Sequence, residues 1–336
     1  MEPVHTPDRR PVDAAETATS PGVSVIVPVR DDPALDQLLA SLAAQRHAPP
    51  FEVVIALDGS RREPNVPPGL AVRLLRLAPR GPYSARNAAI AAARGEILVL
   101  TDSDCVCPRN WIALVERAFR DPSLTVLQGS SRPFDRRRLS RWVQQEYERY
   151  VTSHAADAYR HFCDTRNFAI RADLARALPF PEMFPKGGDG VYGRWLEQKR
   201  IEIRYEPRWT VAHRDPPSRW RLGRREFERG RYGEQWRASA GIDLFGDARG
   251  AGARKGPGFW LLRRLPQAPL ARRLAGAGLL AVAAVLGAAS ALAPEKPGQH
   301  FFSLFRRACH LSGRLYGESL SGPPADRVSS PGARME

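Results

Sequence analysis

Four short runs of apolar residues near the start of the chain place the strongest limit on its fold. They are rich in β-branched side chains and bounded by Gly, Asp and Pro, which predicts buried strands. Two intervening segments read as helices: residues 33–45, with Asp32 as N-cap, and the alanine-rich residues 84–94. This alternation predicts an α/β fold with a mostly parallel sheet. The predicted strands are residues 23–29, 51–57, 71–77 and 96–101.

Polar residues directly follow three of these strands. Arg30 and Asp31 come after the first, Asp58 comes after the second, and Asp102 and Asp104 come after the fourth. Ligands of open α/β sheets bind outside the carboxyl ends of the strands. We therefore expect a binding site at this edge of the sheet.

Asp102 and Asp104 are separated only by Ser103. Two carboxylates this close repel each other, so they either point into solvent or hold a cation. The chain has neither the G-x-G-x-x-G turn of dinucleotide-binding folds nor a P-loop. A nucleotide bound here would need a metal on its diphosphate, and hard cations such as Mn²⁺ or Mg²⁺ take carboxylate and phosphate oxygens. The motif alone leaves both readings open.

The positive charge of the chain is unevenly distributed. The 336 residues carry a formal net charge of +15, and only 4 of the 51 basic residues are lysine, which indicates a general bias toward arginine. Most of the excess lies between residues 190 and 276. A basic region there suits phosphates or an anionic membrane surface. We expect no nucleic-acid partner.

The cysteines and the two ends of the chain have simpler interpretations. The 4 cysteines form no C-x-x-C pair and have no histidines at zinc spacing, so we expect buried free thiols in a reducing compartment. Residues 1–20 and 321–336 are polar and aperiodic, which predicts disorder at both ends.

Six separated segments then follow one another in order: VSVIVPVRDD, FEVVIALDGS, GPYSARNAAIAAARGEILVLTDSDC, TRNFAIRADL, GGDGVYGRWL and IRYEPRWTVAH. Together they resemble the family 2 glycosyltransferases over roughly residues 23–232. The resemblance implies the GT-A fold, an α/β, Rossmann-like mixed sheet flanked by helices, followed here by a helical C-terminal region. It also implies an inverting, metal-dependent sugar transfer.

The resemblance assigns roles to the matching positions. Asp189 matches the general base. Asp102 and Asp104 match the D-x-D pair, the first near the ribose and metal and the second a direct metal ligand. His213 falls where the family often has a histidine near the metal or diphosphate. The positions expected to bind the donor are Pro28, Arg30, Asp58 (near the base), Arg86, Asn87, Asp102 and Asn167.

Two positions depart from the family pattern. Leu57 replaces the first of two aspartates that usually end the second strand, and Gly188 replaces a glutamate that usually precedes the base. Glycine on both sides of Asp189 predicts a freely moving loop. Simpler readings also stand: Asp189 as an ordinary turn acid, His213 as a structural histidine, and Arg86 as a solvated helix residue.

Three later segments have helical or membrane-like patterns. Residues 136–162 have a helical period. Residues 219–237 interleave arginine with aromatic residues, which suits packing on the core, or contact with anionic lipid headgroups or a phosphorylated acceptor. Residues 274–294 contain no charged residue. This uncharged stretch is long enough to span a membrane. We expect a C-terminal membrane anchor or hairpin there, with a buried helix as the alternative.

These observations predict four parts: a disordered segment at residues 1–20, a catalytic domain at 21–238, a helical and membrane-associating region at 239–320, and a disordered tail at 321–336. We expect a sugar to pass from a nucleotide-diphosphate donor to the hydroxyl of a glycan or lipid-linked acceptor, in cell-envelope or extracellular glycan synthesis. The catalytic domain would be cytoplasmic, at the inner face of the cell membrane.

Two other functions stay open. A sugar nucleotidyltransferase can share this kind of sheet, but it normally has a Gly-rich loop with Lys or Arg after the first strand, and residues 27–36 lack one. An inactive, membrane-associated binding protein with the same fold is conceivable because of Gly188.

Overall fold

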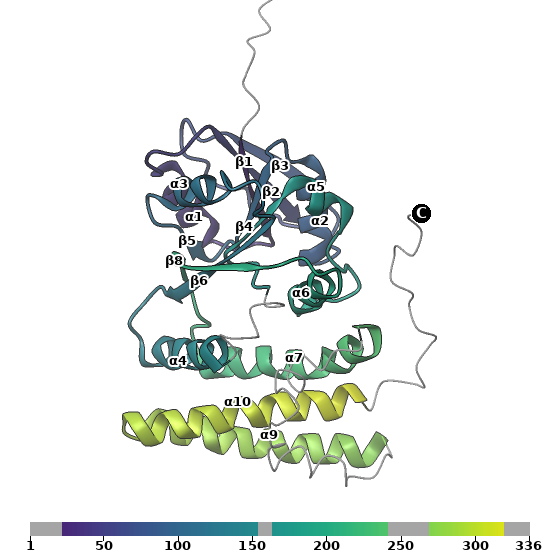
Figure 1. Ribbon diagram of the computed structural model, residues 1–336. Helices are drawn as coiled ribbons and strands as arrows, with labels where there is room; N and C mark the ends of the chain where they lie inside the picture. The colour runs from purple at the N-terminus through teal and green to yellow at the C-terminus, as the bar shows by residue number, and fades with distance from the viewer. Residues whose placement is uncertain (1–21, 154–162, 241–268, 319–336) are drawn as a thin grey trace, which may run out of the picture.

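The structure, a computed structural model, describes residues 22–153, 163–240 and 269–318. Figure 1 shows a sheet flanked by helices, with a layer of long helices beneath it. The two terminal segments predicted to be disordered lie outside the described residues, as does the end of the helix predicted over residues 136–162. The α/β architecture predicted from the alternating strands and helices is confirmed.

Among the described residues, eight strands form one mixed sheet in the order β3-β2-β1-β4-β7-β6-β8-β5. The first four in that order are parallel, as predicted. In the other half, β7 is antiparallel to β4 and β6, and β8 is parallel to β6 but antiparallel to β5. The strands are β1 (Val23–Val29), β2 (Phe51–Asp58), β3 (Val72–Leu77), β4 (Ile97–Leu100), β5 (Cys105–Val106), β6 (Val126–Pro133), β7 (Phe168–Arg171) and β8 (Arg204–His213).

Helices cover both faces of this sheet, and β1 is therefore buried along its whole length. Its side chains alternate between two cores. Val25 and Val27 pack with α1 and α3, whereas Ile26 packs with α2, α5 and α6 on the other face. We call the sheet with these helices the sheet domain. The helices are α1 (Leu35–Ala43), α2 (Pro82–Ala92), α3 (Trp111–Ala118), α5 (Ala172–Ala177) and α6 (Gly188–Gln198).

The predicted strands lie close to the observed ones, and the first agrees residue for residue. The start of the first helix differs. The sequence predicts Asp32 as the N-cap with Pro33 at the first position, but α1 begins at Leu35. Asp32 Oδ1 accepts a hydrogen bond from the Ala34 N–H at 3.0 Å, so this side chain closes a turn ahead of the helix. The N-cap prediction is wrong.

The short strand β5 ties the end of β8 to the loop that follows β4. Cys105 pairs with His213, and Val106 pairs with Ala212, in antiparallel register. A β-bulge between Gly129 and Ser130 shifts the pairing of β6 with β8. As a result, the carboxyl end of β4 and the last residue of β8 meet at one place.

Among the described residues, four long helices form a second layer, which we call the helical layer (Figure 1). α10 lies between α7 and α9, and α9 is outermost. Trp142 of α4 packs on Phe302 of α10 with ring centroids 5.4 Å apart, and its Nε1 donates to Glu295 Oε1 at 2.8 Å. The helices are α4 (Arg138–Ser153), α7 (Arg219–Ala240), α9 (Pro269–Leu292) and α10 (Glu295–Glu318).

α7 and α10 approach each other closely at glycine positions. A Cβ added at Gly313 of α10 would lie 1.8 Å from the carbonyl oxygen of Phe227. A Cβ added at Gly230 of α7 would lie 1.9 Å from the carbonyl oxygen of His310. No side chain fits at either position, so glycine is required for this contact.

α9 turns small residues toward α10 and apolar residues outward. Gly276, Ala283, Gly287 and Ser290 are buried. Within the described ranges, α9 is the one helix long and apolar enough to cross a membrane by length and composition, and 22% of its most apolar window is buried. The alternative prediction of a buried helix is therefore wrong. Its exposed large side chains are Leu270, Leu274, Leu280, Val282, Val285 and Leu292.

Candidate active site

The turn after β4 carries Asp102, Ser103 and Asp104 at the carboxyl end of the strand. The Arg214 N–H, just beyond β8, donates to the backbone oxygen of Asp104 at 3.0 Å. Ser103 Oγ donates to Asp32 Oδ2 at 2.6 Å. The turn is therefore held from two sides, by the end of β8 and by the loop before α1.

Asp104 lies against His213, as the β5–β8 pairing requires. His213 Nε2 is 3.4 Å from Asp104 Oδ2. The Nδ1 atom of the same ring is 3.4 Å from Arg166 Nη1 and 3.7 Å from Asp215 Oδ1. Asp104 Oδ1 is buried and has no hydrogen-bond partner among the described residues. Leaving a buried carboxylate oxygen unpaired costs free energy, and a ligand at this atom would relieve that cost.

The charges of this pair support each other. Burial raises the pKa of Asp104, but the charge and hydrogen bond of His213 outweigh it and lower the pKa below its ordinary value. Burial and Arg166 lower the pKa of His213, whereas Asp104 and Asp215 raise it, and the net shift is upward. Both shifts favour the charged form of each group when no cation is bound.

Asp102 has a cation of its own. Arg86 Nη2 donates to Asp102 Oδ1 at 2.6 Å. Arg86 is only 4% exposed and lies over the Tyr83 ring, 5.3 Å from its centroid. Burial raises the pKa of Asp102, and the opposing charge of Arg86 does not fully offset it. The alternative reading of Arg86 as a solvated helix residue is wrong.

The predicted metal ligands Asp102, Asp104 and His213 are neighbours, but they do not form a closed cage. In the described part of the chain, no three His, Cys, Asp or Glu side chains are grouped to hold a metal. The unpaired Asp104 Oδ1 nevertheless suits a hard divalent cation, which takes oxygen ligands and completes its shell with water and substrate phosphates. The residues therefore fit an open site for Mn²⁺ or Mg²⁺.

The cysteines near this turn are not suited to hold the cation. Cys105 and Cys107 are buried, and all cysteines of the described residues are free thiols, as predicted. Burial raises the pKa of Cys105 well above its ordinary value, and the charges of Asp104 and Asp102 raise it further. A protonated thiol is a poor ligand for a hard cation.

Asp189, the predicted base, lies in the first turn of α6. Its Oδ1 accepts hydrogen bonds from Tyr83 Oη at 3.3 Å and from the Gly190 N–H at 3.0 Å. Burial and the charge of Asp164 raise its pKa, with Arg86 opposing them. A carboxylate whose pKa is raised toward neutrality is better matched to accepting a proton from a hydroxyl group.

Packing explains the glycine that precedes Asp189. A Cβ at Gly188 would lie 2.8 Å from Tyr83 Cε2, so a side chain there would displace the ring. Gly187 adopts the left-handed region, with φ of 77°, and precedes the first residue of α6. The loop predicted around Asp189 is therefore the start of a helix.

Two predicted donor-binding side chains hold loops in place. The Asp58 carboxylate accepts the N–H of Arg80 at 2.7 Å and that of Gly81 at 3.0 Å. Asn87 exchanges two hydrogen bonds with the backbone of Phe180, both at 2.9 Å. These bonds order the segments before α2 and after α5. They also occupy polar atoms of Asp58 and Asn87 that were predicted to meet the donor.

Asn167 is buried away from Asp104. It accepts a hydrogen bond from Trp111 Nε1 at 2.9 Å and donates to the carbonyl oxygens of Ser130 and Trp209 at 2.9 and 2.7 Å. These three bonds join α3, β6 and β8. The structure therefore does not bring the Asn167 side chain together with the other predicted site residues.

Pro28 and Arg30 also differ in position. Pro28 is buried within β1, opposite Ala56 of β2. Arg30 is exposed immediately after the strand. Of the two, Arg30 alone has a side chain open to a ligand.

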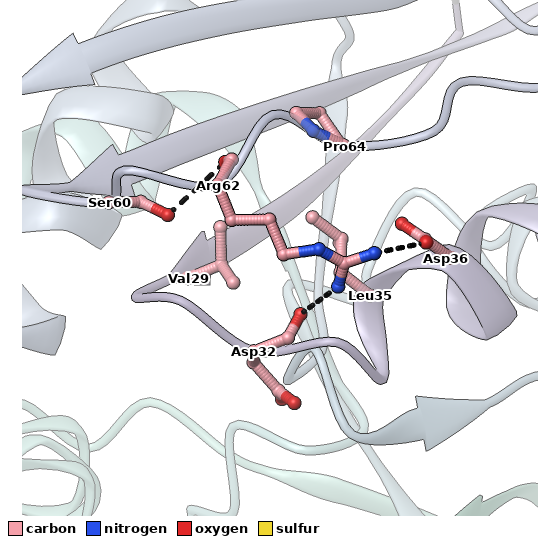
Figure 2. Close-up of a pocket in the computed structure, with 7 residues that line it drawn as sticks. All are labelled: Val29, Asp32, Leu35, Asp36, Ser60, Arg62 and Pro64. Atoms are coloured by element: carbon pink, nitrogen blue, oxygen red, sulfur yellow. Dashed lines mark hydrogen bonds and ion pairs between the residues drawn. The ribbon is translucent and has the colours of Figure 1, made fainter.

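A shallow pocket without room for an enclosed water molecule lies beyond the ends of β1 and β2, and Figure 2 shows its lining. The Arg62 side chain crosses it, pairing with Asp36 and donating to the Asp32 carbonyl oxygen at 3.5 Å. Asp32 also binds Ser103, so the pocket adjoins the turn that carries Asp104. It is lined by Val29, Asp32, Leu35, Asp36, Ser60, Arg62 and Pro64.

Sequence patterns alone miss other residues around the site. Tyr83 binds Asp189, and Arg166 binds Asp164 through its Nε at 2.9 Å while it reaches His213. Both residues lie inside segments that carry the family resemblance, three positions before Arg86 and one before Asn167. Their closeness in sequence to Arg86 and Asn167 could have identified them as candidate site residues.

The sheet and this site together define a GT-A-type α/β domain with an Asp-x-Asp turn after its fourth strand. Residues 24–178 match the family model described as Glycosyl transferase family 2. The matched region runs from β1 to α5 and includes the Asp-x-Asp turn. No curated protein sequence matches the chain.

Three of the similar solved structures contain a nucleotide sugar. A mannosyltransferase from Pyrobaculum calidifontis, in complex with GDP-Man and Mn²⁺, is 22% identical with a TM-score of 0.54, covering 89% of this chain and 88% of its own. TarS 1–349 from S. aureus with UDP-GlcNAc has 20% identity, a TM-score of 0.47 and coverages of 88% and 90%. Glucosyl-3-phosphoglycerate synthase from Mycobacterium tuberculosis, with Mn²⁺ and UDP-Glc, has 16% identity and a TM-score of 0.42. The match covers 59% of this chain and 72% of that one. The first shows that the fold is shared.

Replacing Asn167 by alanine should lower the free energy of unfolding by about 1–3 kcal/mol, because it leaves Trp111 Nε1 and two carbonyl oxygens without their partners. Chemical denaturation measures this change. The exposed Asn65→Ala variant is the control and should stay within about 0.5 kcal/mol of wild type. A stable Asn167→Ala protein with weakened nucleotide binding would instead make Asn167 a donor ligand.

Proposed function

We propose that the protein is an inverting glycosyltransferase that moves a sugar from a nucleotide-diphosphate donor to an acceptor hydroxyl. The observation that carries this proposal is the unpaired, buried Asp104 Oδ1, held beside His213 at the carboxyl end of β4 in a family 2 fold. The similar mannosyltransferase was solved with GDP-Man and Mn²⁺, which agrees with this donor class and with a divalent cation.

We assign the cation to Asp104, with Asp102 and His213 beside it. A bound Mn²⁺ or Mg²⁺ would stabilise the charge that develops on the leaving diphosphate. Arg86 keeps Asp102 in place through its buried ion pair. The nucleotide base and ribose would lie toward the ends of β1 and β2, where Arg30 is exposed.

Asp189 is the proposed general base. The acceptor oxygen forms a bond to the anomeric carbon as the bond from that carbon to the diphosphate oxygen breaks, and the acceptor proton passes to Asp189. The attack comes from the face opposite the leaving group, so the configuration inverts and no covalent enzyme intermediate forms. Tyr83 positions the carboxylate through the hydrogen bond from its Oη.

Asp104→Asn should abolish metal-dependent nucleotide binding, because it removes the charged ligand from a site without a Gly-rich phosphate loop. The measurement is calorimetric titration of UDP and GDP with Mn²⁺ and with a chelator. Asp173→Asn, which changes an exposed aspartate of α5, should bind like wild type. Equal binding by Asp104→Asn and wild type would refute the cation assignment.

Asp189→Asn should keep donor binding and lower kcat by about 10²–10⁴-fold, because the amide cannot accept the acceptor's proton. In wild type the base is active when deprotonated, so kcat should fall as pH falls through the raised pKa of Asp189. The variant should lack this decline. Glu182→Gln, which changes the acid that precedes Asp189 in the chain, should retain most activity; a comparable loss there would move the base to Glu182.

The two other functions make different predictions. Stabilisation by a nucleoside triphosphate together with a sugar 1-phosphate would support a nucleotidyltransferase. Nucleotide binding without transfer to any acceptor would support an inactive binding protein. The transferase needs a cation ligand and a general base. The contact of Asp104 with His213 and that of Asp189 with Tyr83 support these two roles.

We further propose a catalytic domain over residues 21–238 and a membrane-associating region over 239–320, with a glycan or lipid-linked acceptor presented at the inner face of the membrane. α9 would lie along the bilayer surface. α10 lies beside it and carries Arg306, which pairs with Glu146 and Glu226. A spanning α9 would draw these charges toward the hydrocarbon core, which is costly.

The proposed membrane contact predicts that the protein floats with vesicles containing anionic lipid. Val285→Glu changes a side chain that is 70% exposed on α9 and should reduce flotation without changing the melting temperature in water. Met183→Glu changes an exposed apolar residue of the sheet domain and should float like wild type. Equal flotation of both variants would exclude α9 as the contact.

A further inference from the structure

α7 lies between α10 and the sheet domain, and its two sides carry different residues (Figure 1). The side toward α10 includes Gly223, Phe227 and Gly230, each of which directly meets a residue of α10. Glu226 lies on the same side, where it accepts a hydrogen bond from Arg306 Nη2 at 2.7 Å. This side holds the helical layer together.

The other side of α7 is directed at the sheet domain. Its residues are spaced three or four positions apart, which places them on one helix face. Glu228 pairs with Lys186, just ahead of α6. Tyr232 packs against the apolar core that includes α2 and α6, and the charge of Arg229 lowers the pKa of Asp189. The residues of this face are Arg225, Glu228, Arg229 and Tyr232.

Arg225 stands out on this face because it has no partner. Among the described residues its guanidinium forms no hydrogen bond or ion pair, and its Nε is buried. Arg229 Nη1, by contrast, is 3.2 Å from Glu226 Oε1. Glu228 is bound by Lys186 and by Arg224 Nε, the latter at 3.1 Å. Glu226 and Glu228 are therefore already paired with other cations.

The surroundings of Arg225 are also positive. Burial and then Arg229 lower its pKa to about 9, Arg306 and Arg166 add to this effect, and Glu226 opposes it. Glu226 is shared with Arg229 and Arg306, and a desolvated cation that lacks an ion pair of its own is destabilising. Arginine guanidinium binds phosphate oxygens through two parallel N–H donors and would be neutralised by them.

We infer that Arg225, with Arg229 one turn further along α7, binds a phosphate group of a substrate at the helix face directed toward Asp189. The inference rests on the proposed function, because it concerns the chemistry of that enzyme's substrates. The phosphate belongs either to the donor diphosphate or to the acceptor. Glu228 of the same face pairs with Lys186, three residues before Asp189, and this closeness to the proposed base favours a phosphorylated acceptor.

The test uses the full chain with Arg225→Gln. Its control is Arg221→Gln, an exposed arginine of the same helix. Melting temperature is measured against inorganic phosphate at constant ionic strength, and the affinity for UDP and GDP with Mn²⁺ is measured by calorimetry. Without phosphate, Arg225→Gln should melt about 2 °C or more above wild type, because an unpaired charge has been removed.

Phosphate should stabilise wild type and Arg221→Gln but not Arg225→Gln, and Arg225→Lys should recover part of the response. Unchanged nucleotide affinity in Arg225→Gln assigns the phosphate to the acceptor, and a tenfold or greater loss assigns it to the donor. The inference is overturned if phosphate stabilises Arg225→Gln as much as wild type, or if Arg225→Gln melts below wild type without phosphate. A wild type that binds no nucleotide would refute the proposed function. The melting temperatures of wild type and Arg225→Gln with phosphate would still test the inference about Arg225.

Discussion

The antiparallel pairing of Cys105 with His213 is the contact on which the candidate site depends. It fixes the end of β8 beside the turn that follows β4, and the N–H just beyond it holds the backbone oxygen of Asp104. Two side chains far apart in the chain thereby become neighbours without any ligand. Because backbone hydrogen bonds set this geometry, the site is organised before substrate arrives.

The two acids of the turn are balanced by two different cations. Arg86 neutralises Asp102 from a buried position on α2, and His213 lies against Asp104. Each acid therefore has a positively charged partner, and these partners offset the repulsion expected between two carboxylates so close in the chain. The arrangement leaves Asp104 Oδ1 unpaired. One side of the turn is structural, and the other faces the position proposed for the donor.

Strands of the first half could be predicted from the sequence because buried β-branched runs have few alternatives, and β1 agrees exactly with its prediction. The start of α6 could not, because Gly-Gly-Asp-Gly disfavours a helix and only packing against Tyr83 explains it. The patterns identified Asn87 and Asn167 as important but not which way their amides point. The structure directs both toward the protein's own backbone. Arg225 follows no motif, since its isolation depends on which distant acids are already paired.

The glycine contacts between α7 and α10 have a mechanical consequence. With the Phe227 carbonyl seated against Gly313 and the His310 carbonyl against Gly230, the two helices cannot slide along each other without first separating. We therefore expect α7 and α10 to move together as one rigid unit. Lys186, three residues before Asp189, pairs with Glu228 of α7, so a tilt of the two helices would pull on the chain next to the proposed base.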